Sequence, residues 1–174
     1  PFTAIYSSDP AGGETNDAQI AKNGEAVGIA VVSHNDLGGG GFNADVWVHR
    51  HRNGRRVAYV GQWGFGASQP DKCDPANRRG VKVVDVTDPA NPQVVARLQN
   101  PPLTTAEDVE VVTYARGRFK GRDIAAVGIQ ACFRRDARIQ RGLQLFDVTD
   151  PSSPRELGFL DTGMAARGVH ELTV

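Results

Sequence analysis

Three acidic residues recur at one fixed spacing along this 174-residue chain. Asp45, Asp108 and Glu171 are separated by 63 residues each time, and Glu107 and His170 stand directly before the second and the third. Carboxylate oxygens grouped around one point favour Ca²⁺ or Mg²⁺, whereas added imidazoles favour a transition metal. If the fold brings the copies together, the spacing predicts a candidate site for a divalent cation, the only cofactor that the sequence suggests.

The same acids also have a structural interpretation. An acid that recurs at the start of a strand often accepts backbone N–H bonds from the adjoining loop, once in every repeat. A catalytic site seldom needs one copy per repeat, so the structural interpretation is favoured over metal binding. His34 and Asp36 precede Asp45, the first of the three acids. We expect the loop that contains them to lie at the same end of the fold as these acids.

Short strands must position these residues. Apolar runs of four to six residues are bounded by turn residues, and Asn53-Gly54 is the strongest short signal for a hairpin turn. The runs fall into two sets of four: 44–49, 57–61, 80–86 and 93–99, then 107–113, 123–129, 142–148 and 155–161.

One phrase is written twice, as GVKVVDVTDPANPQVV at 80–95 and as GLQLFDVTDPSSPREL at 142–157. Its Asp-Pro pair suits a type I turn, because proline presets φ at the second position. The strand before the turn is apolar on both faces, which is typical of a strand packed between two sheets. A repeated four-stranded antiparallel unit of this kind is a propeller blade. The predicted fold is therefore all-β: a β-propeller of four-stranded antiparallel blades, to which the chain contributes about two, at 44–99 and 107–161.

The flanking segments extend this interpretation. Residues 170–174 would begin a third blade, 25–36 would be a strand that closes the ring, and 1–24 would be an extended arm. A propeller needs at least about four blades. We therefore expect the remainder of the same polypeptide to supply the missing part of a longer ring.

The phrases VVDVTDPANP and LFDVTDPSSP resemble the repeat of bacterial LVIVD-repeat proteins, a β-propeller family of largely undefined activity. The resemblance covers roughly residues 44–174. The repeat length of 62–63 residues departs from the roughly 40–50 of common propeller repeats, through longer loops after the second strand. The resemblance implies an extracellular or cell-surface protein, which the composition does not show.

The chain has two cysteines. Cys73 falls in the loop after the second strand of the first predicted blade, and Cys132 falls at the end of the second strand of the next. Both positions belong to the same face of adjacent blades, so a disulfide between them is feasible and is favoured over two free thiols. Such a bridge would indicate an oxidising compartment.

Two further groups of side chains have competing interpretations. Basic residues crowd the first hairpin of each unit, where they could dock an anionic polymer, lipid or acidic protein. We favour solvated hairpin tips that are partly neutralised by acids of the neighbouring turns, Asp85, Asp88, Asp147 and Asp150. Aromatic residues could form a ligand wall, but we favour a role in filling gaps between blades for Phe42, Trp47, Trp63 and Phe65.

The charge balance narrows the function classes. Lysine and arginine number 20, and so do aspartate and glutamate, which argues against a nucleic-acid binder. No apolar run approaches the roughly 20 residues of a membrane-spanning helix. The leading hypothesis is an exported or surface-displayed propeller that acts as a binding or scaffold module for a protein or a cell-envelope polymer. One alternative is a metal-dependent enzyme whose site, formed by the acids and histidines named above, lies at the mouth of the propeller's central channel. The other is a purely structural subunit of an extracellular assembly.

Overall fold

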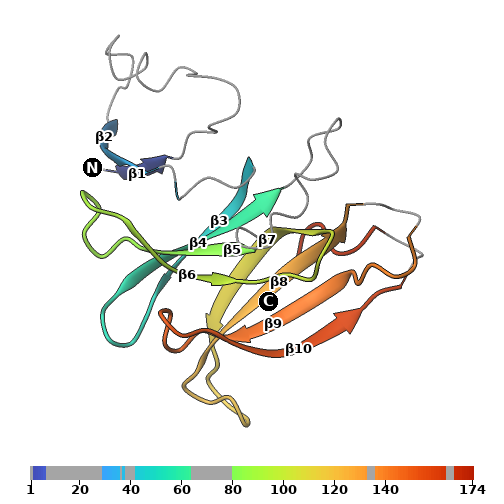
Figure 1. The fold of residues 1–174 in the computed structure, drawn as a ribbon. Coiled ribbons are helices and arrows are strands. Elements are labelled where there is room, and N and C mark those ends of the chain that lie inside the picture. Colours follow the sequence, from blue (N-terminus) through green and yellow to red (C-terminus); the bar gives the residue numbers. More distant parts are fainter. Residues whose placement is uncertain are drawn as a thin grey trace.

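A computed structural model describes residues 2–6, 29–35, 37, 42–63, 80–132, 136–163 and 167–174. Within these ranges the regular elements are all strands, and they form two sheets. The larger is an eight-stranded antiparallel sheet that curls through space (Figure 1). The all-β class is therefore confirmed for the described part of the chain.

The first half of the large sheet is a four-stranded antiparallel unit, named unit 1. It consists of β3 (Phe42–Arg50), β4 (Arg56–Trp63), β5 (Val81–Asp85) and β6 (Gln93–Leu98). Each strand pairs with the next in chain order. The expected hairpin lies between β3 and β4, where Gly54 adopts a φ of 88° that favours glycine.

The second half repeats this arrangement and is named unit 2. It consists of β7 (Thr104–Thr113), β8 (Asp123–Ala131), β9 (Gly142–Asp147) and β10 (Arg155–Asp161). These strands also pair antiparallel in chain order. All eight strands expected from the apolar runs are present, and each end lies within three residues of the expected one.

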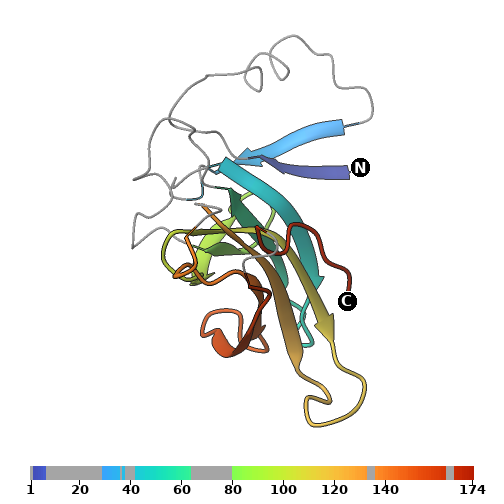
Figure 2. The ribbon, with the colours of Figure 1, turned by 90° about the vertical axis from the view of Figure 1, so that its right-hand side faces the viewer.

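The two units meet along β4 and β7, which pair through a single pair of residues, Gln62 and Ala106. One continuous strand order results, β10-β9-β8-β7-β4-β5-β6, with β3 paired to β4 beside it. Figure 2 shows β3 and β7 running side by side down one side of the fold. The described residues thus form a curled antiparallel sheet of two similar units, and they do not by themselves close a ring.

A glycine makes the close approach of the two units possible. A Cβ atom on Gly61 would stand 1.9 Å from the carbonyl oxygen of Glu107. Gly128 holds the corresponding place in unit 2, where a Cβ atom would stand 2.9 Å from the carbonyl oxygen of Val169. Segment 167–169 therefore lies against β8 of unit 2 as β7 lies against β4 of unit 1. Gln130 of β8 forms a β-bridge with Gly168, as Gln62 of β4 pairs with Ala106 of β7.

The core lies mainly between the two units. Its members come from β4, β5, β6, β7, β8 and β9, and Tyr59, Val83, Val109 and Ile129 are completely buried. Residues alternate between the two faces of a strand, so the opposite face of unit 1 holds a second, smaller cluster. There Leu37 packs on Ala58, Val60, Val84 and Val86. The expectation that the strand at 80–86 is buried on both faces is confirmed.

The repeated phrase forms the same turn in both units. In unit 1 the carboxylate of Asp85 accepts the backbone N–H of Thr87, and that of Asp88 accepts the N–H of Ala90. The hydroxyl of Thr87 accepts the N–H of Arg56, which ties the turn to the start of β4. In unit 2 the same three roles fall to Asp147, Asp150 and Thr149. The sequence segment therefore recurs because its polar side chains form the same hydrogen-bonded turn in each unit.

The N-terminal strands differ in part from expectation. The expected closing strand at 25–36 is a strand at Ile29–His34 (β2), but it pairs in parallel with Phe2–Tyr6 (β1), within the segment expected to be an extended arm. Residues 2–6 read FTAIY, a run rich in β-forming residues. The 7–28 connection is long enough for the crossover that parallel strands require. β1 and β2 form a separate two-stranded sheet.

Candidate functional site

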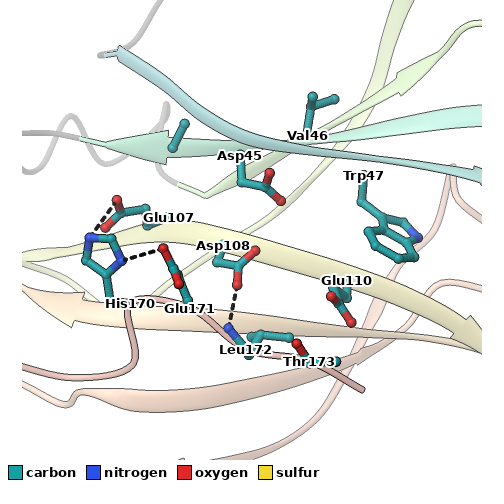
Figure 3. Close-up of a pocket in the computed structure, with 11 residues that line it drawn as sticks. Asp45, Val46, Trp47, Glu107, Asp108, Glu110, His170, Glu171, Leu172 and Thr173 are labelled. Carbon is teal, nitrogen blue, oxygen red and sulfur yellow. Dashed lines mark hydrogen bonds and ion pairs between the residues drawn. The ribbon is translucent and has the colours of Figure 1, made fainter.

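An open groove of about 770 Å³ lies beside residues 44–47 of β3, the middle of β7 and the segment 170–173 (Figure 3). Five carboxylates, one imidazole and one indole line it. They belong to Asp45, Glu107, Asp108, Glu110, Glu171, His170 and Trp47. The structure therefore brings together five of the seven residues that the sequence predicted for a site at the channel mouth.

Asp108 stands in the middle of the groove and is held by the backbone of the third segment. Its Oδ2 atom accepts the N–H of Leu172 at 2.6 Å. Burial and the nearby carboxyl of Asp45 raise the pKa of Asp108, although the Leu172 hydrogen bond works in the opposite direction. Figure 3 shows the side chains of Asp45 and Asp108 pointing into the same space from β3 and β7.

Glu107 lies at one end of the groove, next to His170. Its Oε1 is 3.1 Å from Nε2 of His170, whose Nδ1 is 3.9 Å from the carboxylate of Glu171. Burial raises the pKa of Glu107, and the neighbouring carboxylates of Asp108 and Glu171 add to the effect. The other oxygen of Glu107, Oε2, is buried and has no hydrogen-bond partner.

The groove is assembled from contacts that repeat along the chain. Val174 N–H donates to Glu110 at 2.8 Å, as Leu172 N–H does to Asp108, and both pairs are 64 residues apart. The indole N–H of Trp47 donates to the carbonyl of Val111, again 64 residues away. The acid at Asp108 therefore has the structural role that the sequence favoured, since it accepts a backbone N–H from the segment 170–174.

The other predicted site residues lie elsewhere. His34 is not among the groove residues, because Ser33 and Asn35 on either side of it bond the carbonyls of Pro89 and Pro92 in the β5–β6 turn. That turn lies at the end of unit 1 opposite to the groove. Asp36, Phe65 and Cys73 lie outside the described residues, as do the side chains of Phe42 and Trp63.

Cys132 directly follows β8, and its N–H donates to the carbonyl of Leu103 at 3.0 Å. Cys132 is not a free thiol in the structure. Because its expected partner Cys73 is outside the described residues, the bridge between them stays a prediction.

The basic hairpins meet the acids of the repeated turns. Arg55 contacts Asp85 at 2.8 Å, and Arg122 pairs with Asp147. Arg55 also donates to the hydroxyl of Ser152, which belongs to the β9–β10 turn of unit 2. These contacts support the interpretation of the hairpins as partly neutralised tips, and they connect the two units at the end opposite to the groove.

A second cluster of titratable side chains lies at that opposite end, and the sequence interpretation missed it. His49 at the end of β3, His51 just after it and Asp123 at the start of β8 converge there. Nδ1 of His51 is 2.8 Å from Oδ2 of Asp123, and Nε2 of His49 is 3.2 Å from Oδ1. Two imidazoles from unit 1 thus share one buried carboxylate from unit 2.

Surrounding side chains hold this cluster in place. Nε2 of His51 is 3.0 Å from the hydroxyl of Tyr59, and the hydroxyl of Thr113 donates to Oδ1 of Asp123. Burial lowers the pKa of His51, although Asp123 opposes the shift, and burial and Asp123 both raise the pKa of Tyr59. The ligand atoms of His49, His51 and Asp123 all lie within 4.8 Å of one another, which is close enough to hold a metal ion.

The sequence carried one signal for this cluster, the His-x-His pair within VHRHR. Histidines two apart in a strand point to the same face. Asp123 has no comparable signal, because its place beside the histidines depends on how unit 2 packs on unit 1.

Comparison with protein-family models, with curated proteins and with solved structures finds no match to this chain. Nowhere in the described ranges does a helix have the length and hydropathy needed to cross a bilayer.

Proposed function

We propose that the two units are blades of a β-propeller of the LVIVD-repeat type, and that further blades complete the ring. The 64-residue offset supports this, since segment 170–174 contacts β7 as β7 contacts β3. So does the uncovered apolar surface of unit 1, where Val46 and Val48 are 55% and 60% exposed. A preceding blade would cover them as unit 1 covers unit 2.

In function, this propeller is an extracellular or cell-surface binding or scaffold module. The observation that carries the proposal is the groove, where five carboxylates from three segments surround one open space with Trp47 at its edge. Concentrated negative charge attracts cationic ligands and repels anionic ones. A lysine- or arginine-rich segment of a protein partner is therefore the ligand class that the groove suits best.

Binding of a short oligolysine peptide tests this function. Trp47 lines the groove, so its fluorescence should change as the peptide binds. Replacing Glu107 and Glu171 with glutamine should weaken binding several-fold, since an ion pair to an exposed acid such as Glu171 alone contributes about 0.2–1 kcal/mol. Added salt should weaken it as well.

Two controls make this result specific. Glu156→Gln removes an exposed acid of β10, outside the groove, and should leave peptide binding unchanged. An oligoglutamate peptide of equal length should not bind. If the wild-type chain does not bind oligolysine, or if the groove variant binds it as tightly as wild type does, the proposed function is wrong.

The second candidate is a metal-dependent enzyme with a divalent cation in the groove. Its support is Oε2 of Glu107, a buried carboxylate oxygen with no hydrogen-bond partner. Replacing Asp108 with asparagine and His170 with alanine should then abolish uptake of Ca²⁺ or Mg²⁺ and leave the fold intact. The binding-module proposal expects the reverse: no uptake of Ca²⁺ or Mg²⁺ by wild type, and lower stability of the variant because Asp108 no longer holds Leu172 as firmly.

A further inference from the structure

We propose that His49, His51 and Asp123 form a binding site for a divalent transition metal, with Zn²⁺ as the probe of choice. The site lies at the β3–β4 hairpin end of the molecule. Along β3, His49 stands four positions after Asp45 of the groove, a rise of about 13 Å. The proposal is therefore independent of the groove and of the function assigned to it.

The donor atoms are of the kind and number that such a metal takes. Two imidazole nitrogens and a carboxylate oxygen, with one further position for water, are a common ligand set of zinc. In a tetrahedral site the donors lie about 2.0–2.2 Å from zinc, hence roughly 3.3 Å from one another. Nε2 of His49 is already 3.2 Å from Oδ1 of Asp123, and all three ligand atoms lie within 4.8 Å of one another.

The surrounding groups orient the ligands as outer-shell partners do. To bind a metal through Nδ1, His51 must carry its proton on Nε2, and there the hydroxyl of Tyr59 accepts it at 3.0 Å. The hydroxyl of Thr113 holds Oδ1 of Asp123 from one side. The imidazole of His51 and the carboxylate of Asp123 are thus each oriented by a hydroxyl group that would not bind the metal.

The exposed fractions of the three ligand side chains indicate where a metal ion would reach the site. The side chains of His51 and Asp123 are 1% and 3% exposed, whereas that of His49 is 13% exposed. The fourth position would therefore face solvent past the imidazole of His49.

Among the described residues the cluster occurs once, although the two units are similar. The hydrogen-bonded turns formed by the DVTDP sequence occur in both units. At the positions that correspond to His49, His51, Tyr59 and Asp123, the other unit has Val112, Tyr114, Ala126 and Arg56. A cluster that stabilises the fold of every unit would occur in both units. The single occurrence of this one therefore favours a role other than stabilising the fold.

Titration of the metal-free chain with Zn²⁺ by isothermal calorimetry tests the site. Wild type should bind one equivalent, and Co²⁺ in its place should give the intense visible bands of a four-coordinate ion. His49→Gln should reduce affinity by more than the 10- to 100-fold that is typical of outer-shell changes, and Tyr59→Phe should reduce it by about 10- to 100-fold. His170→Gln, which changes the imidazole of the groove, is the matched control and should bind as wild type does.

Several results would overturn the proposal. If wild type binds no Zn²⁺, the cluster is a metal-free hydrogen-bonded contact between the units. If His170→Gln loses the metal while His49→Gln keeps it, the metal belongs in the groove. Should His49→Gln fail to fold, the proposal is refuted either by unchanged affinity in Tyr59→Phe or by an octahedral Co²⁺ spectrum of the wild-type chain.

Discussion

The indole nitrogen of Trp47 donates a hydrogen bond to the backbone carbonyl of Val111, 3.0 Å away and 64 residues further along the chain. The same offset relates Asp108 to Leu172 and Glu110 to Val174. Different side chains therefore make one kind of contact from the first strand of each unit to the segment that lies beside it. A regular repeat of structure is maintained here by polar contacts to the backbone as well as by apolar packing.

Replacing Trp47 with phenylalanine should reduce the free energy of unfolding. The aromatic ring is largely kept, but the hydrogen bond to Val111 is lost, and one such bond has a net contribution of about 0.5–1.5 kcal/mol. Urea denaturation followed by circular dichroism measures the change. Arg50→Gln is the control on the same strand, because the polar side chain of Arg50 is exposed and its change should stay within about 0.5 kcal/mol. Equal effects of the two variants would contradict this role of the indole.

Gly61→Ala should destabilise the contact between the units. The added methyl group would stand 1.9 Å from the carbonyl oxygen of Glu107, a backbone atom, so one of the strands must move. Overpacking of this kind commonly costs about 1–3 kcal/mol. Gly158→Ala is the matched control, since a Cβ atom on this strand residue would meet nothing within 4 Å. If both variants unfold at the same denaturant concentration, the close approach of β4 and β7 is not what requires glycine at position 61.

The strands could be predicted from the sequence because their signals are local. Alternating apolar residues, Asn53-Gly54 and the two Asp-Pro turns each specify structure within a few neighbours. The turn chemistry of Asp85, Thr87 and Asp88 was anticipated only as a type I turn. That Thr87 also bonds the start of β4 follows from the pairing of strands and has no local signal.

Residues whose surroundings come from distant segments were harder to predict. The equal spacing of Asp45, Asp108 and Glu171 was enough to place them at one end, because each unit repeats the same path. His34 has no repeated counterpart, and its position depends on how β2 rests on the β5–β6 turn. Asp123 likewise meets His49 and His51 only through packing between units, so composition and spacing could not reveal that cluster.

The expected bridge between Cys73 and Cys132 can be tested by counting thiols. The unfolded chain, kept unreduced, should contain no thiol that reacts with Ellman's reagent. The bridge would close a loop of about 60 residues and contribute roughly 2–4 kcal/mol, so reduction should lower the free energy of unfolding by that amount. A double replacement by serine should match the reduced protein. Two reactive thiols in the unreduced chain would contradict the bridge and remove its support for an extracellular location.

Acid should destabilise the chain through the repeated turns. Burial alone would raise the pKa values of Asp85 and Asp147, but hydrogen bonds from Thr87 and Thr149 and the guanidinium groups of Arg55 and Arg122 outweigh it and hold both below the ordinary value of 3.8. A carboxyl whose pKa is lower in the folded state stabilises the fold above its unfolded value. That contribution is lost as the pH falls from about 4 through the folded value.

The double variant Asp85→Asn, Asp147→Asn should therefore be less stable than wild type at neutral pH and should lose less stability on acidification. Denaturant unfolding at a series of pH values measures both effects. Val84→Ala is the control: it removes a buried methyl pair beside Asp85 and no titrating group, so its stability should lie below that of wild type by a constant amount at every pH. A double variant whose curve runs parallel to that of wild type would show that these two carboxylates do not stabilise the turns through their charge.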